Sequence, residues 1–386
     1  MASSRLKFKL FHVPFRPPTI FPPLIMSGSW FTELFGFKEE TQSAAAWSST
    51  RSRLSYDAST GTLRTPSGEF RAGHFSTPTL GDLRAAGRAL LQSGAGGEPT
   101  LTLSHETTED VLIEHASAPA GSVFLAASGL NCLEFPGHGG SPTMGVTCYE
   151  GDRTQGPACA LACAGGTVVR NYFSDNTPDT QIDCLATLAD AIGGARAPWI
   201  VHAGYIRGSS EDGAAATAAL NDANANFFAR GSASRAALRA LVRVGVHADT
   251  GVNFASRWRR TDADIHVTQV YAAALSLGGY KTPRAVHDDS WEPLATLVLE
   301  AAYEATLWAG VAAAARAGVP RGNVYLCGLG LGVFGNEPAW VANAIGRAVA
   351  TLRAEGAALD VHFLHFREVS AALKRDIDTA AMRTYE

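Results

Sequence analysis

The stretch Asn323-Val-Tyr-Leu-Cys327, Gly328-Leu-Gly-Leu-Gly-Val-Phe-Gly335 and Asn336 through Arg353 predicts a strand, a glycine-rich turn and a helix. Pro338 suits the first helical turn, because its missing N–H would have no helical partner there. The glycines permit positive φ and let a ligand approach the backbone closely. Backbone N–H groups beside a helix N-terminus bind anions, so this stretch predicts a phosphate site. The alternative is a glycine-rich crossover that serves only close packing.

The composition is that of a globular protein with a large core. The chain has 386 residues, of which 46% are hydrophobic and 18% charged. Its formal net charge of -4 and the lack of a long Lys/Arg run argue against a dedicated nucleic-acid-binding protein. We expect the six cysteines to be reduced, buried thiols of an intracellular, cytoplasmic or nuclear protein. No apolar run reaches the ~18–20 residues of a membrane-spanning helix, so we expect no membrane partner.

The N-terminal residues differ from the rest, and they define the first of three expected regions. Residues 1–26 are basic, rich in proline and free of acidic residues, which predicts a disordered leader; an organelle-targeting peptide is the alternative. Residues 27–110 are expected to form a supporting region. Residues 111–386 are expected to form the main α/β domain, with an insertion at about 173–290.

A second loop follows an early strand. Val123–Ala127 reads as a buried strand, and the next residues form a long Gly/Pro-rich loop of the kind that carries binding residues in α/β folds. The continuation places Glu150, Asp152, Arg153 and Gln155 between glycines, just before an expected helix. Carboxylates in such a place perform acid/base chemistry more often than those on a plain helix face. The alternative is a solvated loop with a structural salt bridge.

Strand-like and helix-like segments alternate along the chain, which predicts a three-layer α/β/α sandwich. Besides the segments above, Asp360–Phe366 reads as a late strand and Pro293–Arg316 as a long helix. Thr79–Ser93 is predicted to be a helix opened by a threonine cap. Thr167–Tyr172 is predicted to be a strand.

Two motifs invite other interpretations. Gly330–Gly335 matches the dinucleotide pattern G-x-G-x-x-G, which would make the protein an NAD(P)-dependent oxidoreductase. That pattern requires an acidic residue at the end of the next strand, whereas Asp360 begins it. Cys159 and Cys163 share a helix face, but no second pair lies at metal-ligand spacing. We therefore expect buried thiols, no metal and no cofactor.

The two loops together resemble the macro domain family, whose α/β/α fold with a mixed central sheet binds ADP-ribose. The late loop, Gly328–Asn336, is similar to that family's diphosphate loop. The early loop, with Asn131, Gly139-Gly140 and Val146, is similar to the family's asparagine followed by a glycine-rich ribose loop. The fold implied is a macro-like sandwich with an N-terminal extension and a large internal insertion.

The resemblance implies a ligand, ADP-ribose or a related nucleotide diphosphate, and residues that hold it. The residues implied in binding are Asn131, Gly139, Gly140, Val146, Gly330, Gly332, Val333, Phe334, Gly335 and Asn336. A distant similarity to the poly(ADP-ribose) glycohydrolase branch implies hydrolysis of an ADP-ribosyl bond, although that branch carries adjacent glutamates. In this chain Glu150 is the first candidate for the carboxylate that would assist hydrolysis, and Asp152 is the second. A non-catalytic ADP-ribose reader is the alternative.

Overall fold

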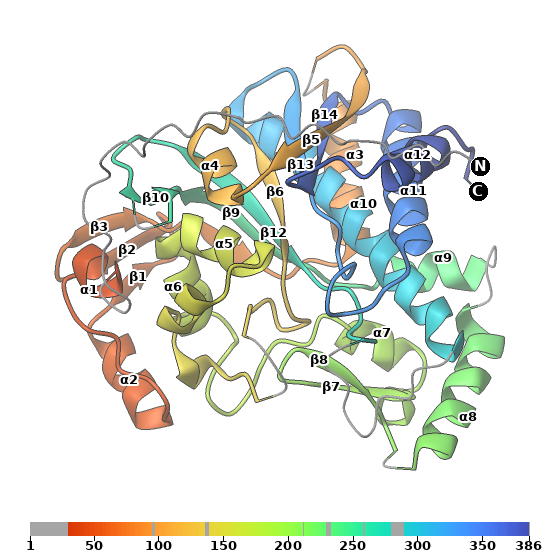
Figure 1. Cartoon of the computed structure of the whole chain (residues 1–386), viewed down its shortest axis with the longest axis horizontal. Helices are drawn as coiled ribbons and strands as arrows, with labels where there is room; N and C mark the ends of the chain where they lie inside the picture. The colour runs from red at the N-terminus through yellow and green to blue at the C-terminus, as the bar shows by residue number, and fades with distance from the viewer. Residues whose placement is uncertain are drawn as a thin grey trace, which may run out of the picture.

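The computed structural model describes residues 30–94, 97–135, 139–210, 212–228, 233–257, 259–278 and 289–385. The expected leader, residues 1–26, lies outside these ranges. Figure 1 shows the arrangement of the described elements.

A mixed, seven-stranded sheet forms the centre of the described structure, in the order β4-β9-β12-β6-β13-β14-β5. Five neighbours, β12, β6, β13, β14 and β5, run parallel, whereas β9 lies antiparallel to both β12 and β4. The strands are β4 (His74–Ser76), β5 (Leu101–Thr108), β6 (Val123–Ala127), β9 (Gly245–Gly251), β12 (His266–Ala272), β13 (Gly322–Leu326) and β14 (Leu359–Phe366). The strands predicted at Val123–Ala127, Asn323–Cys327 and Asp360–Phe366 are confirmed.

Helices cover both faces of this sheet (Figure 1). On one face lie α3 (Leu80–Gln92), α10 (Glu292–Ala317), α11 (Pro338–Ala354) and α12 (Ala371–Ala381). On the other lie α4 (Val111–Ala116), α5 (Gln155–Ala162) and α6 (Ala164–Tyr172). The side chains alternate accordingly: Val324 faces Gly310 of α10, while Phe124 stacks on His115 of α4. The predicted three-layer α/β/α class is therefore confirmed.

Helix α10 is the central helix of its layer. It begins with Pro293 in its first turn and ends at Gly318, whose left-handed conformation (φ 65°) closes the helix. Gly310 lies so close to the sheet that an added Cβ would come within 2.5 Å of Val324 Cγ2. Among the described residues, α10 is the one helix long and apolar enough to cross a membrane, but 89% of its apolar window is buried inside the protein.

The prediction of a strand at Thr167–Tyr172 is wrong, because these residues form α6. Every residue of α6 is buried, so the helix has no polar face to reveal its period in the sequence. Tertiary packing overrides the β-branched composition: an added Cβ at Gly166 would lie 2.4 Å from Thr250 Oγ1 of β9. The small residue thus lets the helix approach the sheet closely.

The sheet also contains strands from the segment expected to be a supporting region and from the segment expected to be an insertion. β4 and β5 come from before residue 111, and β9 and β12 come from within 173–290. The peripheral elements of that second segment are α7 (Ala186–Ala191), β7 (Trp199–His202), β8 (Tyr205–Gly208), α8 (Gly213–Ala223), α9 (Ala233–Arg239), β10 (Phe254–Ser256) and β11 (Arg259–Arg260). Before β4 lie α1 (Trp30–Phe35), α2 (Ala44–Ser52), β1 (Ser55–Asp57), β2 (Thr62–Thr65) and β3 (Gly68–Arg71).

A row of stacked rings crosses the sheet on the α4 side. His115, Phe124, Tyr325 and His362 lie one after another, with ring centroids 3.7, 4.5 and 4.9 Å apart. His115 is fully buried; its Nδ1 donates to Val111 O (2.8 Å), and its Nε2 accepts from Gln269 Nε2 (3.0 Å). Burial lowers the pKa of His115 from 6.5 to about 4, because the charged ring would lose its hydration.

This neutral histidine should make stability depend on pH. The pKa of His115 is lower in the folded state than in the unfolded state. Its contribution to the free energy of unfolding is therefore complete above pH 6.5 and is lost as the pH falls towards 4. Between about pH 7 and about pH 5, the parent should lose roughly 2 kcal/mol more unfolding free energy than His115→Phe, which keeps the ring but cannot titrate. Urea unfolding at both pH values measures this difference. Parallel losses in the two proteins would contradict the assignment.

Candidate functional site

The candidate site is a cleft of about 240 Å³ at the carboxyl ends of β6, β12 and β13. β6 pairs with β12 along its whole length but with β13 at only two positions, Val123↔Val324 and Phe124↔Tyr325. Beyond them β6 and β13 diverge. The chain after β6 forms α5 on one face of the sheet, and the chain after β13 forms α11 on the other. When the connections after two neighbouring strands leave on opposite faces of an open α/β sheet, the crevice between them is the usual ligand site.

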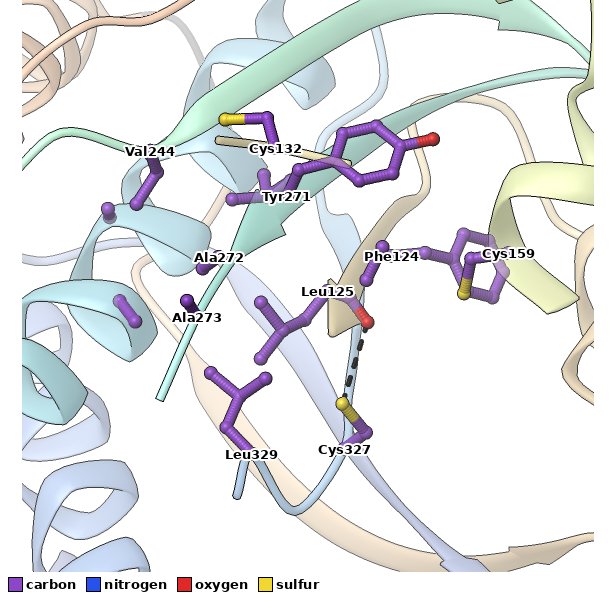
Figure 2. Close-up of a cluster of buried hydrophobic side chains, with 14 of the residues drawn as sticks. Phe124, Leu125, Cys132, Cys159, Val244, Tyr271, Ala272, Ala273, Cys327 and Leu329 are labelled. Atoms are coloured by element: carbon purple, nitrogen blue, oxygen red, sulfur yellow. Dashed lines mark hydrogen bonds between the residues drawn. The ribbon is translucent and has the colours of Figure 1, made fainter. Parts of the chain in front are cut away.

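The side chain of Gln155 forms hydrogen bonds with the backbone of β6 at the point where β6 and β13 diverge. Its Nε2 donates to Leu125 O (2.7 Å), and its Oε1 accepts from Ala127 N (2.9 Å). The amide thus satisfies the backbone groups of β6 that would otherwise pair with a continuing β13. Cys327, just after β13, reaches the same carbonyl with its Sγ at 3.7 Å, as the dashed line in Figure 2 shows. Leu125 and Leu329 belong to the buried hydrophobic core, and Figure 2 draws both among its side chains.

The first turn of α5 forms one wall of the cleft. Thr154, Gln155, Gly156 and Pro157 all line it. Gly156 is required there, because an added Cβ would lie 1.7 Å from Ala127 O. This contact brings the N-terminus of an eight-residue helix, with its positive end of the dipole, against the end of β6.

The glycine-rich loop after β13 forms the opposite wall. Gly330, Gly332, Val333 and Phe334, four of the residues predicted to bind a ligand, line the cleft. Among the described residues, the N–H groups of Gly330, Gly332 and Val333 have no protein acceptor. Gly330 needs its positive φ of 74°, whereas Gly332 has an ordinary φ and nothing within 4 Å of an added Cβ. The loop therefore presents backbone donors beside open space.

Two other residues predicted in this loop brace it from behind. Gly335 donates its N–H to Gly332 O (3.0 Å) and packs on Gly278. Asn336 is buried, and its Nδ2 donates to Leu275 O (2.8 Å). They fix the shape of the loop without lining the cleft.

The predicted residues of the early loop lie away from the cleft. Asn131 is buried, with Oδ1 accepting from Leu133 N (3.1 Å) and Nδ2 donating to Gln181 Oε1 (2.7 Å). Gly204, in the turn between β7 and β8, packs on its amide, so this turn fills the space beside Asn131. The other early-loop residues are placed as follows: Gly139 and Gly140 line a second, polar hollow of about 430 Å³, and Val146 is fully buried.

The two candidate carboxylates differ in position. Asp152 lines the cleft, and its Oδ1 accepts from Thr154 N (2.8 Å) and Thr154 Oγ1 (2.7 Å). Glu150 is not among the residues that line the cleft. The backbone carbonyls of both residues accept hydrogen bonds from Arg257, at 3.1 Å for Glu150 and 3.0 Å for Asp152.

The sequence interpretation missed a buried ion pair beneath the cleft. Glu134, which lines the cleft, accepts from Arg170 Nη1 at 2.8 Å, and both side chains are almost completely buried. The Arg170 guanidinium also lies 3.6 Å from the centre of the Tyr271 ring and donates to Cys132 O. Burial raises the pKa of Glu134 to about 7, and the positive charge of Arg170 opposes the rise. The sequence did contain a signal, because Glu134 and Arg170 are charged residues within apolar stretches. It was missed because Arg170 falls in Thr167–Tyr172, which was wrongly predicted to be a strand.

Asp360 cannot serve as the ribose clamp of a dinucleotide site. It lies at the start of β14, where it accepts from Thr102 Oγ1 (2.6 Å) and pairs with Arg321 (2.9 Å). Because β14 runs parallel to β13, this position is at the edge of the sheet opposite the cleft. The arrangement disfavours the oxidoreductase alternative.

No protein-family model and no curated protein sequence matches the chain. The structure is similar to poly(ADP-ribose) glycohydrolase from Deinococcus radiodurans in complex with ADP-ribose, with 14% identity, 79% of this chain and 93% of that chain covered, and a TM-score of 0.42. It is also similar to the Thermomonospora curvata glycohydrolase bound to the inhibitor ADP-HPD, with 16% identity, 87% and 97% covered, and a TM-score of 0.39. Similarity of this size carries no argument about function, which has to be drawn from the site.

The close packing of α5 on β6 gives a test of the site's architecture. Gly→Ala inside a helix usually stabilises by about 1 kcal/mol, but Gly156→Ala should destabilise by about 2 kcal/mol or more, because its methyl group meets Ala127 O. Gly332→Ala is the control and should change stability by less than about 0.5 kcal/mol, because its Cβ meets nothing. Chemical denaturation measures both. A stable Gly156→Ala protein would show that α5 does not pack this way.

Proposed function

We propose that the cleft binds ADP-ribose or a related nucleotide diphosphate. The observation that carries the proposal is that two sets of residues with available backbone donors line one crevice. One set is Gly330, Gly332 and Val333, whose N–H groups have no acceptor within the described ranges, and the other is the first turn of α5. A diphosphate is the anion that can use both walls together, since its two groups carry charge and acceptor oxygens.

The rest of the lining suits a nucleoside. The aromatic rings of Phe334 and Tyr205, which both line the cleft, have centroids 5.8 Å apart, and Leu133 and Val333 add apolar surface. A few polar groups among apolar and aromatic walls are typical of sites for small organic ligands. The resemblance of the glycine loop to the macro-domain diphosphate loop favours the same ligand.

The ligand preference follows from the two walls. ADP-ribose should bind at least about tenfold more tightly than AMP, because only ADP-ribose offers a diphosphate and a second ribose. Gly332→Glu should remove that preference by placing a negative charge where phosphate belongs. Gly332→Ala, which adds volume without charge, should weaken binding much less. Parallel calorimetric titrations measure these affinities, and equal binding of AMP and ADP-ribose by the parent would contradict the two-walled site.

We further propose Asp152 as the carboxylate for hydrolysis of an ADP-ribosyl bond, with Glu150 as the second candidate. Hydrolysis adds water to the anomeric carbon and breaks its bond to the leaving group, which takes up a proton. A carboxylate assists by removing the proton from water or by supplying one to the leaving group. Asp152 is favoured because it lines the cleft, and the hydrogen bonds from Thr154 both fall on Oδ1.

Matched substitutions separate the two carboxylates. Asp152→Asn should lower the rate of ADP-ribose release by about 10²–10⁴ while changing ADP-ribose affinity little, because an amide cannot transfer the proton. Glu150→Gln should retain most of the rate. Release from ADP-ribosylated protein and nucleic acid, followed by chromatography, provides the assay. The reverse order of effects would make Glu150 the catalytic group, and a parent that binds ADP-ribose but releases none would be a reader.

A further inference from the structure

Two thiols from distant parts of the chain touch in the interior of the protein and take no part in the proposed function. The Sγ atoms of Cys132 and Cys184 lie 3.5 Å apart, although 52 positions separate the two residues. Both side chains are buried, at 0% and 4% exposure, and neither is in a disulfide. Cys132 belongs to the early loop, two residues before Glu134, which lines the cleft. Cys184 lies two residues before α7.

Backbone hydrogen bonds hold the two cysteines in this position. Cys184 N donates to Leu130 O (2.9 Å), and Arg243 N donates to Cys184 O (3.0 Å). The carbonyl oxygen of Cys132 accepts from the guanidinium of Arg170. Because both main chains are fixed close to the contact, each sulfur stays within reach of the other, and a reaction between them is effectively intramolecular.

The protein also makes room for this contact. An added Cβ at Gly245, the first residue of β9, would lie 2.8 Å from Cys132 Sγ, so a larger residue there would displace the thiol. Cys132 itself has a φ of 62°, a left-handed conformation that is strained for a residue with a side chain. Strain of this kind persists where the surrounding structure requires one particular position of a side chain.

The other cysteines are not arranged in this way. All six lie within the described ranges, and Cys132 with Cys184 is the one pair among them whose sulfurs are in hydrogen-bonding contact. Figure 2 shows Cys132 separate from Cys159 and Cys327. The sulfur of Cys327 reaches the carbonyl of Leu125 instead, at 3.7 Å.

The contact distinguishes the two thiols chemically. The hydrogen bond with Cys132 and burial raise the pKa of Cys184, so Cys184 keeps its proton and donates it to Cys132 Sγ. Cys132 is then the sulfur available to attack an oxidant, and Cys184 is the thiol that can resolve the product. A pair of this kind, with one attacking and one resolving thiol, is typical of cysteines that are oxidised reversibly.

The second hollow brings solvent close to the pair. Ile182 and Asp183, which directly precede Cys184, both line this hollow of about 430 Å³. The two thiols are themselves covered, which excludes bulky reagents and favours a small oxidant such as a peroxide.

We infer that Cys132 and Cys184 are a redox modification site, which reduces a peroxide and becomes a disulfide that clamps the early loop to the segment before α7. With hydrogen peroxide, the Cys132 thiolate attacks one oxygen and breaks the O–O bond. Cys132 becomes a sulfenic acid, and the other oxygen takes up a proton and leaves as water. The sulfur of Cys184 then attacks the sulfenic sulfur, so that the S–S bond forms and the hydroxyl leaves as water with the Cys184 proton. The two sulfurs lose two electrons, and the peroxide gains them.

The disulfide joins positions on either side of the early loop, α5 and α6. A cross-link over 52 positions removes conformational freedom from the unfolded chain, so the oxidised protein unfolds at a higher temperature. Leu133 and Glu134, which follow Cys132 and line the cleft, are held more firmly. The inference does not depend on which ligand the cleft binds.

The test treats the folded parent with a small excess of hydrogen peroxide, blocks the remaining thiols with N-ethylmaleimide in denaturant, and identifies cross-linked peptides by mass spectrometry. We expect a peptide pair joined through Cys132 and Cys184, and the loss of two of the six free thiols. The midpoint of thermal unfolding should rise by about 5 °C in the oxidised protein. Dithiothreitol should restore both thiols and the original midpoint.

Two matched variants separate this pair from general oxidation. Cys184→Ser keeps the size of the side chain but removes the resolving thiol, so peroxide should produce neither the cross-link nor the rise in the unfolding midpoint. Cys148 is the one cysteine of the six that is not fully buried, and its Sγ donates to Gly145 O (3.0 Å). Cys148→Ser should therefore form the same disulfide as the parent. If Cys184→Ser does not fold, the peptide map of the parent decides the question alone.

Three outcomes would overturn the inference. One is a folded parent in which Cys132 and Cys184 both remain thiols, whether or not Cys148 is oxidised. Another is a Cys132–Cys184 disulfide that forms only after unfolding in urea, because the folded contact would then have no part in the reaction. The third is a disulfide that leaves the unfolding midpoint unchanged, which would show that the early loop is not clamped.

Discussion

The site depends on the divergence of β6 from β13. Parallel strands that separate leave backbone N–H and C=O groups without partners, and a buried group in that state is strongly destabilising. Gln155 removes this difficulty by bonding to both Leu125 O and Ala127 N with one side-chain amide. The sheet can then open at its carboxyl edge without losing hydrogen bonds. The glycine loop and the N-terminus of α5 face each other across the gap.

The floor of the cleft is held by charge rather than by apolar contact alone. Glu134 and Arg170 form a buried pair, and Arg170 also bonds to the backbone at Cys132 and covers the Tyr271 ring. Burying such a pair gives little net stability, whereas removing one partner leaves an uncompensated charge and is strongly destabilising. The pair is better understood as fixing the position of the early loop relative to α6 and β12. That role accounts for a buried ion pair at the floor of the cleft, where Glu134 is one of the lining residues.

The N-terminal region also shapes the surroundings of the site. Glu39 is buried, and its carboxylate accepts from Val146 N, Thr147 N, Thr147 Oγ1 and Tyr172 OH. One side chain from before the sheet thus ties the early loop to the end of α6. Together with the β7–β8 turn against Asn131, it holds the early loop so that Gly139 and Gly140 line a second hollow, while Leu133 and Glu134 line the cleft.

The sequence by itself determined the elements whose patterns are local. The strands at Val123–Ala127 and Asn323–Cys327, the glycine loop and the capped helix α3 follow from apolar runs, turn residues and caps that act over a few positions. For the same reason Gly330, Gly332, Val333 and Phe334 could be predicted in one cleft wall.

Only the tertiary structure decided the state of Thr167–Tyr172, because a helix buried on all sides has no periodic pattern. It also decided that Asn131 is covered, that Gln155 bridges a gap in the sheet and that Glu134 meets Arg170. These results depend on which distant residues fill the space around each side chain, and no local pattern encodes that.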